Sequence, residues 1–171
     1  MPVAGRIETD RLLLAPLTQE AAHAALSDPA RAARLMGASV AEGWPSDDLR
    51  DALPVYASAL VRDPGELGWG IWAVIDKADV KLAGDVGFKG KPDGTGTVEI
   101  GYGIAPPYRR RGYAVEASQA LIDWGFSHPE VHRIVAECLE DNTASIGVLE
   151  KLGMVQTEPW GRMLRWELKR S

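Results

Sequence analysis

The sequence predicts an α+β fold: a single mixed, splayed β-sheet of about seven strands with helices on both faces. Three strand-like segments, 69–76, 81–90 and 96–106, are separated by short turns of Gly, Asp and Lys, which is typical of an antiparallel meander. The segments that follow alternate between strand and helix patterns, without the regular βαβ repeat of a dinucleotide-binding fold. With 171 residues and neither an internal repeat nor a long linker, the chain is expected to form one domain over residues 1–171.

The N-terminal part supplies one strand and several helical pieces. Residues 7–17 alternate around apolar positions and predict a first strand. Thr18 is positioned to cap a short alanine-rich helix, and Ser46 to cap another whose first turn is acidic. Pro54 is expected to break that second helix into two pieces, because proline removes an internal hydrogen bond.

The C-terminal part alternates between helix and strand. Apolar residues recur at helical spacing from Tyr113 to about Ser127, and residues 133–141 follow as a strand. Asn142 then caps a helix that Gly153 ends, and residues 163–170 form the last strand.

Composition excludes several classes of protein. A net charge of −5 and a pI near 5.2 argue against a nucleic-acid-binding protein, which is normally basic. No apolar run approaches the roughly 18 residues that a membrane span needs. The lone Cys138 allows no internal disulfide, and the three histidines show no metal-ligand spacing, so neither a metal site nor an oxidising compartment is expected. These features predict a cytoplasmic protein with no membrane partner.

Three consecutive arginines, Arg109, Arg110 and Arg111, stand between a predicted strand and a predicted helix. Gly112 follows them, and the small Ala114 lies in the first turn of the helix. Unpaired N–H groups at a helix N-terminus bind phosphate, and arginine side chains add charge-assisted contacts. Neither the phosphate-binding loop of nucleotide hydrolases nor the dinucleotide fingerprint is present. The pattern therefore predicts a site for another phosphate-bearing ligand.

The pattern Arg109-x-x-Gly112-x-Ala114 resembles the pyrophosphate motif of the GCN5-related N-acetyltransferases. Around it, TDRLLLAPLT, EIGYGIAPPYRRRGYAVEA and HRIVAECLEDNTASIGVLEKLGM are similar, in the same order, to segments of the ribosomal-protein N-terminal acetyltransferase subgroup. The resemblance covers nearly the whole chain and is weakest between about residues 38 and 66. It implies an acetyl-CoA-dependent enzyme whose sheet parts between the strands around Ile100 and Val135, so that pantetheine lies between them.

The same resemblance implies a set of cofactor contacts. The backbone from Tyr102 to Ile104 would pair with the pantetheine amides, and Asn142 would reach this arm from the other side. The pyrophosphate would be held by the N–H groups of Arg110, Arg111, Gly112, Tyr113 and Ala114, with Arg109 beside them.

Direct acetyl transfer also needs a base and an acid. Glu99, directly before the cofactor segment, is the first candidate base, and Glu137 is the reserve; a surface ion pair is the alternative role for Glu99. Leu149 stands where many relatives carry a tyrosine that acts as the general acid, so Ser145 is the candidate acid here. The alternative role of the Ser145 hydroxyl is a hydrogen bond to the helix backbone. Cys138 is expected to be a core thiol, with an acyl-cysteine route as the alternative.

The acceptor is predicted less specifically. An α-amino group, with a pKa near 8, needs less help from a base than a lysine with a pKa near 10.4, which favours a protein N-terminal amine. Small-molecule amines are the alternative acceptors, and a catalytically inactive acyl-CoA sensor is the alternative function.

Two further groups of residues are candidates for contacting the acceptor. Trp44 and Trp160, both in predicted loops, are candidates for lining an acceptor groove. An acidic cluster is a candidate for attracting a cation, although helix capping also explains it: Glu42, Asp47, Asp48 and Asp51. A homodimer is compatible with the sequence.

Overall fold

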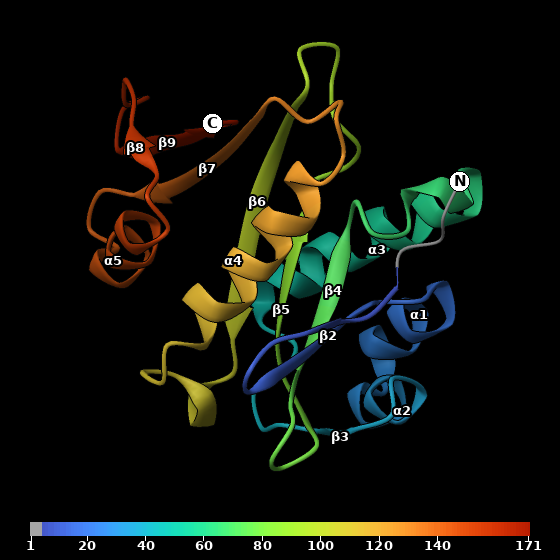
Figure 1. Cartoon of the computed structure of the whole chain (residues 1–171). Coiled ribbons are helices and arrows are strands. Elements are labelled where there is room, and N and C mark those ends of the chain that lie inside the picture. The colour runs from blue at the N-terminus through green and yellow to red at the C-terminus, as the bar shows by residue number, and fades with distance from the viewer. Residues whose placement is uncertain (1–4) are drawn as a thin grey trace.

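The computed structural model describes residues 5–171, in which nine strands form one mixed sheet (Figure 1). The strands are β1 (Ile7–Glu8), β2 (Leu12–Pro16), β3 (Ser39–Val40), β4 (Ile71–Asp76), β5 (Lys81–Phe88), β6 (Thr97–Ile104), β7 (Arg133–Leu139), β8 (Val155–Gln156) and β9 (Met163–Lys169). The helices are α1 (Gln19–Ser27), α2 (Pro29–Leu35), α3 (Asp47–Arg62), α4 (Tyr113–Phe126) and α5 (Thr143–Lys151), with 3-10 turns η1 (Pro64–Glu66) and η2 (Pro106–Tyr108). The strand order is β1-β2-β4-β5-β6-β7-β9-β8, and β3 pairs with β5.

The sheet confirms the predicted α+β class and opens at its centre. Strands β4, β5 and β6 form the expected antiparallel meander. Strand β6 then pairs with β7 in parallel, but only from Thr97 to Glu99, after which the two strands diverge (Figure 1). The expected parting of the strands near Ile100 and Val135 is therefore present.

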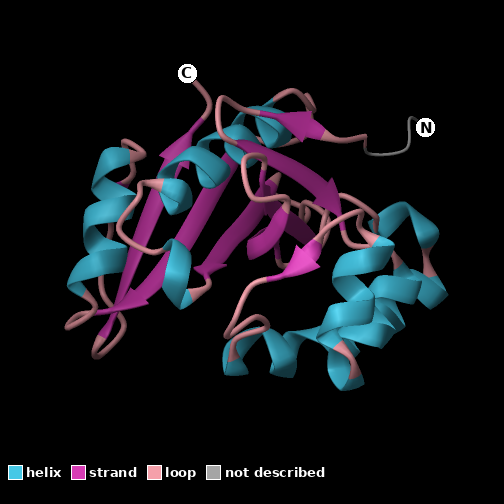
Figure 2. Cartoon of the chain, turned by 90° about the horizontal axis from the view of Figure 1, so that it is seen from below, coloured by secondary structure: helices cyan, strands magenta, loops and turns pink. Residues whose placement is uncertain are grey.

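Helices cover both faces of the sheet (Figure 2). Helix α4 packs against β5 and β6 on one face, where its Ala117 and Leu121 are fully buried. Helix α3 lies on the other side and buries Leu53 and Tyr56, whose hydroxyl donates to the Leu17 carbonyl at 2.5 Å. Strand β6 is thus held between two different environments, one on each face.

Two predictions about the N-terminal part were wrong. The expected single strand over 7–17 is two strands, because Thr9 turns the chain and its hydroxyl accepts from the Leu12 amide at 3.0 Å. Helix α3 continues through Pro54 instead of breaking. Pro54 lies on the exposed side of the helix, so water can satisfy the carbonyl it leaves unpaired, while the buried face keeps the helix in place.

The predicted helix caps are confirmed. Thr18, Ser46 and Asn142 each accept a hydrogen bond from a backbone N–H in the first turn, at 3.2, 3.2 and 3.1 Å. Gly153 follows α5 with φ of +79°, a conformation that favours glycine. Within residues 5–171, none of the helices is both long and apolar enough to cross a membrane.

Candidate active site

The arginine loop leads into a helix N-terminus that no side chain covers. Gly112 is the N-cap of α4, with φ of +81°, and Arg110 also adopts a positive φ of +63°. The α-helices α1, α2, α3 and α5 of the described chain each have a capping side chain, whereas α4 has none. The first N–H groups of α4 are therefore free to bind an anion, beside three exposed arginines.

Contacts from the first strands brace this loop. The Arg11 guanidinium donates to the Arg111 carbonyl at 2.7 Å, pairs with Glu116 at 2.8 Å and lies 4.6 Å above the Tyr113 ring. Burial alone would raise the pKa of Glu116, but hydrogen bonds from Thr9 and Arg11 outweigh it and hold the pKa below its usual range. The loop is therefore fixed before any ligand arrives.

Two tyrosines next to the arginines anchor the same loop to carboxylates at the end of β4 and in the turn after it. Tyr108 donates to Asp79 at 2.7 Å, and Tyr113 donates to Asp76, a carboxylate that is only 3% exposed. Burial and then the Asp79 carboxylate raise the pKa of Tyr108 to about 12, which keeps the phenol protonated and donating.

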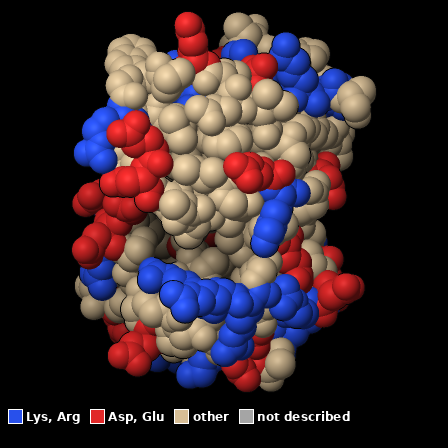
Figure 3. Space-filling view, turned by 90° about the vertical axis from the view of Figure 1, so that its left-hand side faces the viewer, with Lys and Arg blue, Asp and Glu red and all other residues tan. Residues whose placement is uncertain are grey.

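The strand before the loop has a free edge. Residues Ile100 to Ile104 pair with β5 on one side, but their pairing with β7 has already ended at Glu99. Arg109 secures the end of this segment, since its Nε donates to the Ile104 carbonyl at 2.9 Å. On this side of the molecule the surface is hollowed, and Lys and Arg side chains gather along one border of the hollow (Figure 3). An extended chain bearing amides can pair with such an edge.

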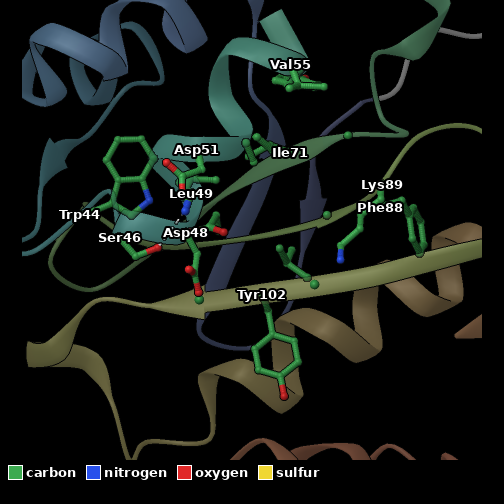
Figure 4. Close-up of a pocket in the computed structure, with 18 of the residues that line it drawn as sticks. Trp44, Ser46, Asp48, Leu49, Asp51, Val55, Ile71, Phe88, Lys89 and Tyr102 are labelled. Atoms are coloured by element: carbon green, nitrogen blue, oxygen red, sulfur yellow. Dashed lines mark hydrogen bonds between the residues drawn. The ribbon is translucent and has the colours of Figure 1, made fainter. Parts of the chain in front are cut away.

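The predicted acid and the cysteine lie close to this opening. Tyr102 extends from β6 away from the pocket residues labelled in Figure 4, and its buried hydroxyl has no well-formed hydrogen bond among the residues that the structure describes. Burial raises the pKa of Tyr102, and the neighbouring Ser145 hydroxyl partly offsets the rise. Ser145 is partly exposed, Cys138 is buried, and Leu149 is only 1% exposed.

A pocket of about 920 Å³ opens on the other face of β6, between α3 and the meander. In Figure 4, side chains from α3 and its preceding loop stand across from Phe88 and Lys89. Gly101 and Gly103 of β6 line the pocket, so this strand presents backbone to it instead of side chains. The apolar wall consists of Trp44, Leu49, Val55, Tyr56, Trp69, Ile71 and Phe88, and the carboxylates are Asp48, Asp51, Glu66 and Asp85. This pocket suits a cation carried on an apolar body.

Asp85 is the most perturbed carboxyl in the pocket. Burial raises the pKa of Asp85 to about 7, and the Trp44 indole beside it offsets only part of that rise. Trp44 is itself 5% exposed, and its Nε1 has no well-formed hydrogen bond to any residue from 5 to 171.

The two glutamates predicted as bases are both ion-paired. Glu99 is bound to Lys89, with 26% of its side chain exposed. Glu137 pairs with Arg165 of the neighbouring strand β9 at 3.2 Å. Among the described residues, the pocket lining includes Lys89 but neither glutamate.

Comparison with known proteins identifies the family. Residues 11–155 match the model of the acetyltransferase (GNAT) domain. The chain belongs to the GNAT acetyltransferases. An uncharacterised N-acetyltransferase of Bacillus subtilis, YjdG, is 35% identical over 160 residues, which span 94% of this chain and 95% of YjdG.

Solved structures agree with this assignment. A GNAT-family acetyltransferase from Bacillus anthracis is 27% identical, with a TM-score of 0.65 over 96% of this chain and 98% of that one. The ribosomal-protein-S5-alanine acetyltransferase of Vibrio fischeri shares the fold at 18% identity, with a TM-score of 0.67 over 96% of both chains. The predicted family and the predicted enzyme class, an acetyltransferase, are confirmed.

The acetyltransferase has two groups of candidate site residues, separated by β6. The predicted phosphate and pantetheine residues, from Tyr102 to Ala114, surround the free edge and the uncapped helix. Sequence reasoning missed Asp85, which it assigned only to a strand, and it overlooked Lys89. Of the two loop tryptophans, Trp44 lines the pocket, whereas Trp160 is 72% exposed and lies elsewhere.

Proposed function

We propose that this acetyltransferase moves the acetyl group of acetyl-CoA to a primary amine, with a protein N-terminal α-amine as the favoured acceptor. One observation carries the proposal: β6 has a free backbone edge toward β7 and an acidic, aromatic pocket on its α3 side. A donor and an acceptor can therefore approach the same strand from opposite sides, which is what direct transfer requires.

The residues that would hold acetyl-CoA fit that ligand in this chain. The free N–H groups of Arg110 to Ala114 suit the pyrophosphate, with the Arg109, Arg110 and Arg111 side chains at the same turn. The unpaired edge of Tyr102 to Ile104 suits the pantetheine amides. Asn142 uses its side-chain oxygen to cap α5, which leaves its NH₂ group to donate to the same arm.

Bound acetyl-CoA supplies the acetyl thioester. The amine nitrogen forms a bond to the acetyl carbon and loses one N–H proton, the bond from that carbon to sulfur breaks, and the sulfur leaves as a thiolate that takes up a proton. We assign the delivery of that proton to Ser145, which is partly exposed beside the opening where Leu149 offers no acidic group, and whose hydroxyl regains a proton from solvent while the N–H proton leaves through the base. Glu99, on β6 itself, is the base predicted from the sequence, and a free N–H of β6 would stabilise the developing oxyanion.

The pocket favours a cationic acceptor, and two classes of acceptor are compatible with it: a peptide N-terminal amine and a small-molecule amine. Its carboxylates attract an ammonium group, and its aromatic wall suits an apolar neighbour. An α-amine, with a pKa near 8, reaches its reactive neutral form more readily than a lysine amine. The fold shared with a ribosomal-protein acetyltransferase also supports a peptide. A small amine with an aromatic or aliphatic body is the second candidate, because apolar side chains form much of the pocket wall.

Thermal unfolding with and without acetyl-CoA tests the cofactor site. Ligand at 100 times its dissociation constant should add about 2.7 kcal/mol of stability. For a chain of this size that corresponds to a rise in Tm of roughly 5 to 10 °C. Gly112→Asp should abolish the rise, because it strains a residue at φ of +81° and places a carboxylate against the phosphates. A wild-type protein that acetyl-CoA does not stabilise would refute the proposal.

Acceptor screening separates an enzyme from a sensor. Short peptides differing in their first residue, together with their N-acetylated counterparts, are incubated with acetyl-CoA, and thiol release is followed. An enzyme of the proposed class releases thiol only with the free peptides. Stabilisation by acetyl-CoA without turnover of any peptide or small primary amine would favour the sensor instead.

A further inference from the structure

The Asp85 carboxyl lies across the pocket face of β6, directly over a glycine. Asp85 of β5 is the register partner of Gly103 on β6. A methyl group added at Gly103 would lie 3.5 Å from Asp85 Oδ1 and 3.9 Å from Ser46 Oγ. The absent side chain thus leaves a small space bounded by a carboxylate and a hydroxyl, on the strand whose other edge is free.

Two further observations indicate that this space receives a polar group. The Trp44 Nε1 atom is buried beside Asp85 and lacks a well-formed hydrogen bond. Within residues 5–171, no Lys, Arg or His forms an ion pair with Asp85, and a buried carboxyl needs either a partner or a proton. An indole N–H without a well-formed hydrogen bond and a carboxyl without a cationic partner among the described residues, both lining one pocket, are typical of a ligand site.

We propose that Asp85 is the carboxylate that receives the acceptor's amino group over Gly103 and takes its proton before acetyl transfer. The assignment rests on the proposed function and specifies its acceptor half. In the step, one N–H bond of the ammonium breaks, the proton joins an Asp85 oxygen, and the electron pair stays on nitrogen as the nucleophile. Asp85 keeps partial exposure to the pocket, so the proton can return to solvent through its mouth.

The surroundings favour Asp85 over Glu99 for this role. The Glu99 carboxylate is already bound to Lys89, whereas Asp85 has no cationic partner in the described part of the chain. A carboxyl whose pKa is about 7 is also matched to proton transfer near neutral pH. Other titratable or charged groups lining the pocket are Asp48, Asp51 and Tyr56 from α3, Glu66 from η1, Lys89 after β5 and Arg109 after η2, while the Tyr102 ring extends from β6 away from it. The three further carboxylates favour a cation in the pocket, and so support the approach of an ammonium.

The first test measures Asp85 directly, without acetyl-CoA or turnover. Protein labelled with ¹³C at the aspartate carboxyls is titrated by NMR, and the Asp85 signal is identified by its loss in Asp85→Asn. The titration is repeated with benzylamine and with benzyl alcohol, which has the same ring but no charge. Benzylamine should lower the midpoint of Asp85 by about one pH unit or more, because a cation favours the ionised carboxyl. A midpoint that benzylamine does not move, or that both probes move equally, would overturn the assignment.

The second test uses the pH dependence of turnover with the best acceptor. Wild-type kcat/KM should rise through about pH 7 as Asp85 ionises. Asp85→Asn should lower it about 10²- to 10⁴-fold and remove that rise. Asp123→Asn, a matched change on the exposed side of α4, should retain both. If Glu99→Gln removes the rise and Asp85→Asn retains it, Glu99 is the base and the inference is wrong.

Gly103→Ala provides a variant that keeps the carboxyl but fills the space over it. The added methyl meets Asp85 at ordinary van der Waals distance, so the protein should fold. KM for the acceptor should rise severalfold or more, while the Tm rise with acetyl-CoA persists. An unchanged KM would contradict the proposed position of the amine. If acetyl-CoA does not raise the Tm of the wild-type protein, the proposed cofactor site is refuted, independently of the NMR result.

Discussion

The two sides of β6 are built in different ways. On the side toward β7 and α4, the groups that would bind the donor belong mainly to the backbone: a free strand edge and an uncapped helix N-terminus. On the side toward α3, the pocket is made of side chains from distant segments, such as Trp44 and Asp85. A site made of backbone depends on local conformation, whereas a site made of side chains depends on tertiary packing. The two sides should therefore respond differently to the same kind of change.

The largest effect is expected within the pocket side, where an added methyl group meets very different packing on β5 and on β6. A Cβ at Gly87 of β5 would lie 2.4 Å from the Gly70 carbonyl oxygen, whereas a Cβ at Gly101 of β6 would meet nothing within 4 Å. Gly87→Ala should lower the free energy of unfolding by about 3 kcal/mol, because backbone cannot easily move aside. Gly101→Ala should change it by less than about 1 kcal/mol. Urea unfolding of both variants measures the difference, and equal stabilities would show that the pocket strands are more adaptable than their packing indicates.

The N-cap residues and the arginine loop could be identified from the sequence because their signals are local. Ser46 precedes an acidic first turn, and Gly112 separates three arginines from an apolar-periodic helix, so each pattern lies within a few residues. The pocket carries no such signal. Asp85 stands in a strand like any other polar residue, and it acquires its environment only when Trp44, 41 positions earlier, folds onto β5. Pro54 shows the same limit, because only the packed face of α3 reveals why the helix continues.

The raised pKa of Asp85 makes a second, intermediate prediction, about stability. An aspartate has a pKa near 3.9 in the unfolded chain and about 7 in this fold, so the folded state binds the extra proton between these values. The stabilisation from that proton is fully present below about pH 4 and is lost as pH rises through 7. Asp85→Asn cannot ionise, so its folded state does not lose this stabilisation as the pH rises. The variant should be more stable than the wild type at pH 8 by an amount on the order of 2 kcal/mol.

The advantage should largely disappear at pH 4, where Asp85 is protonated in the folded state and about half protonated in the unfolded chain. Thermal unfolding at the two pH values measures it, with Asp123→Asn as the exposed control. A variant that is less stable than the wild type at pH 8 would show that the Asp85 charge is compensated in the fold. Greater stability combined with lost turnover is the exchange expected of a functional group held in an unfavourable environment.

Salt should produce the smallest effect and separate the two sides most directly. The arginines of the loop are exposed, so their attraction for the phosphates of acetyl-CoA is screened by ions. Raising NaCl from about 50 to about 500 mM should weaken acetyl-CoA binding roughly three- to tenfold, measured by calorimetry. Arg110→Ala should bind more weakly and lose part of this salt dependence. The titration midpoint of Asp85 should move little over the same range, because burial sets it and buried groups are screened much less. If the midpoint shifts as strongly as the binding weakens, the pocket is open enough to solvent that Asp85 resembles a surface carboxylate, and the distinction between the two sides of β6 fails.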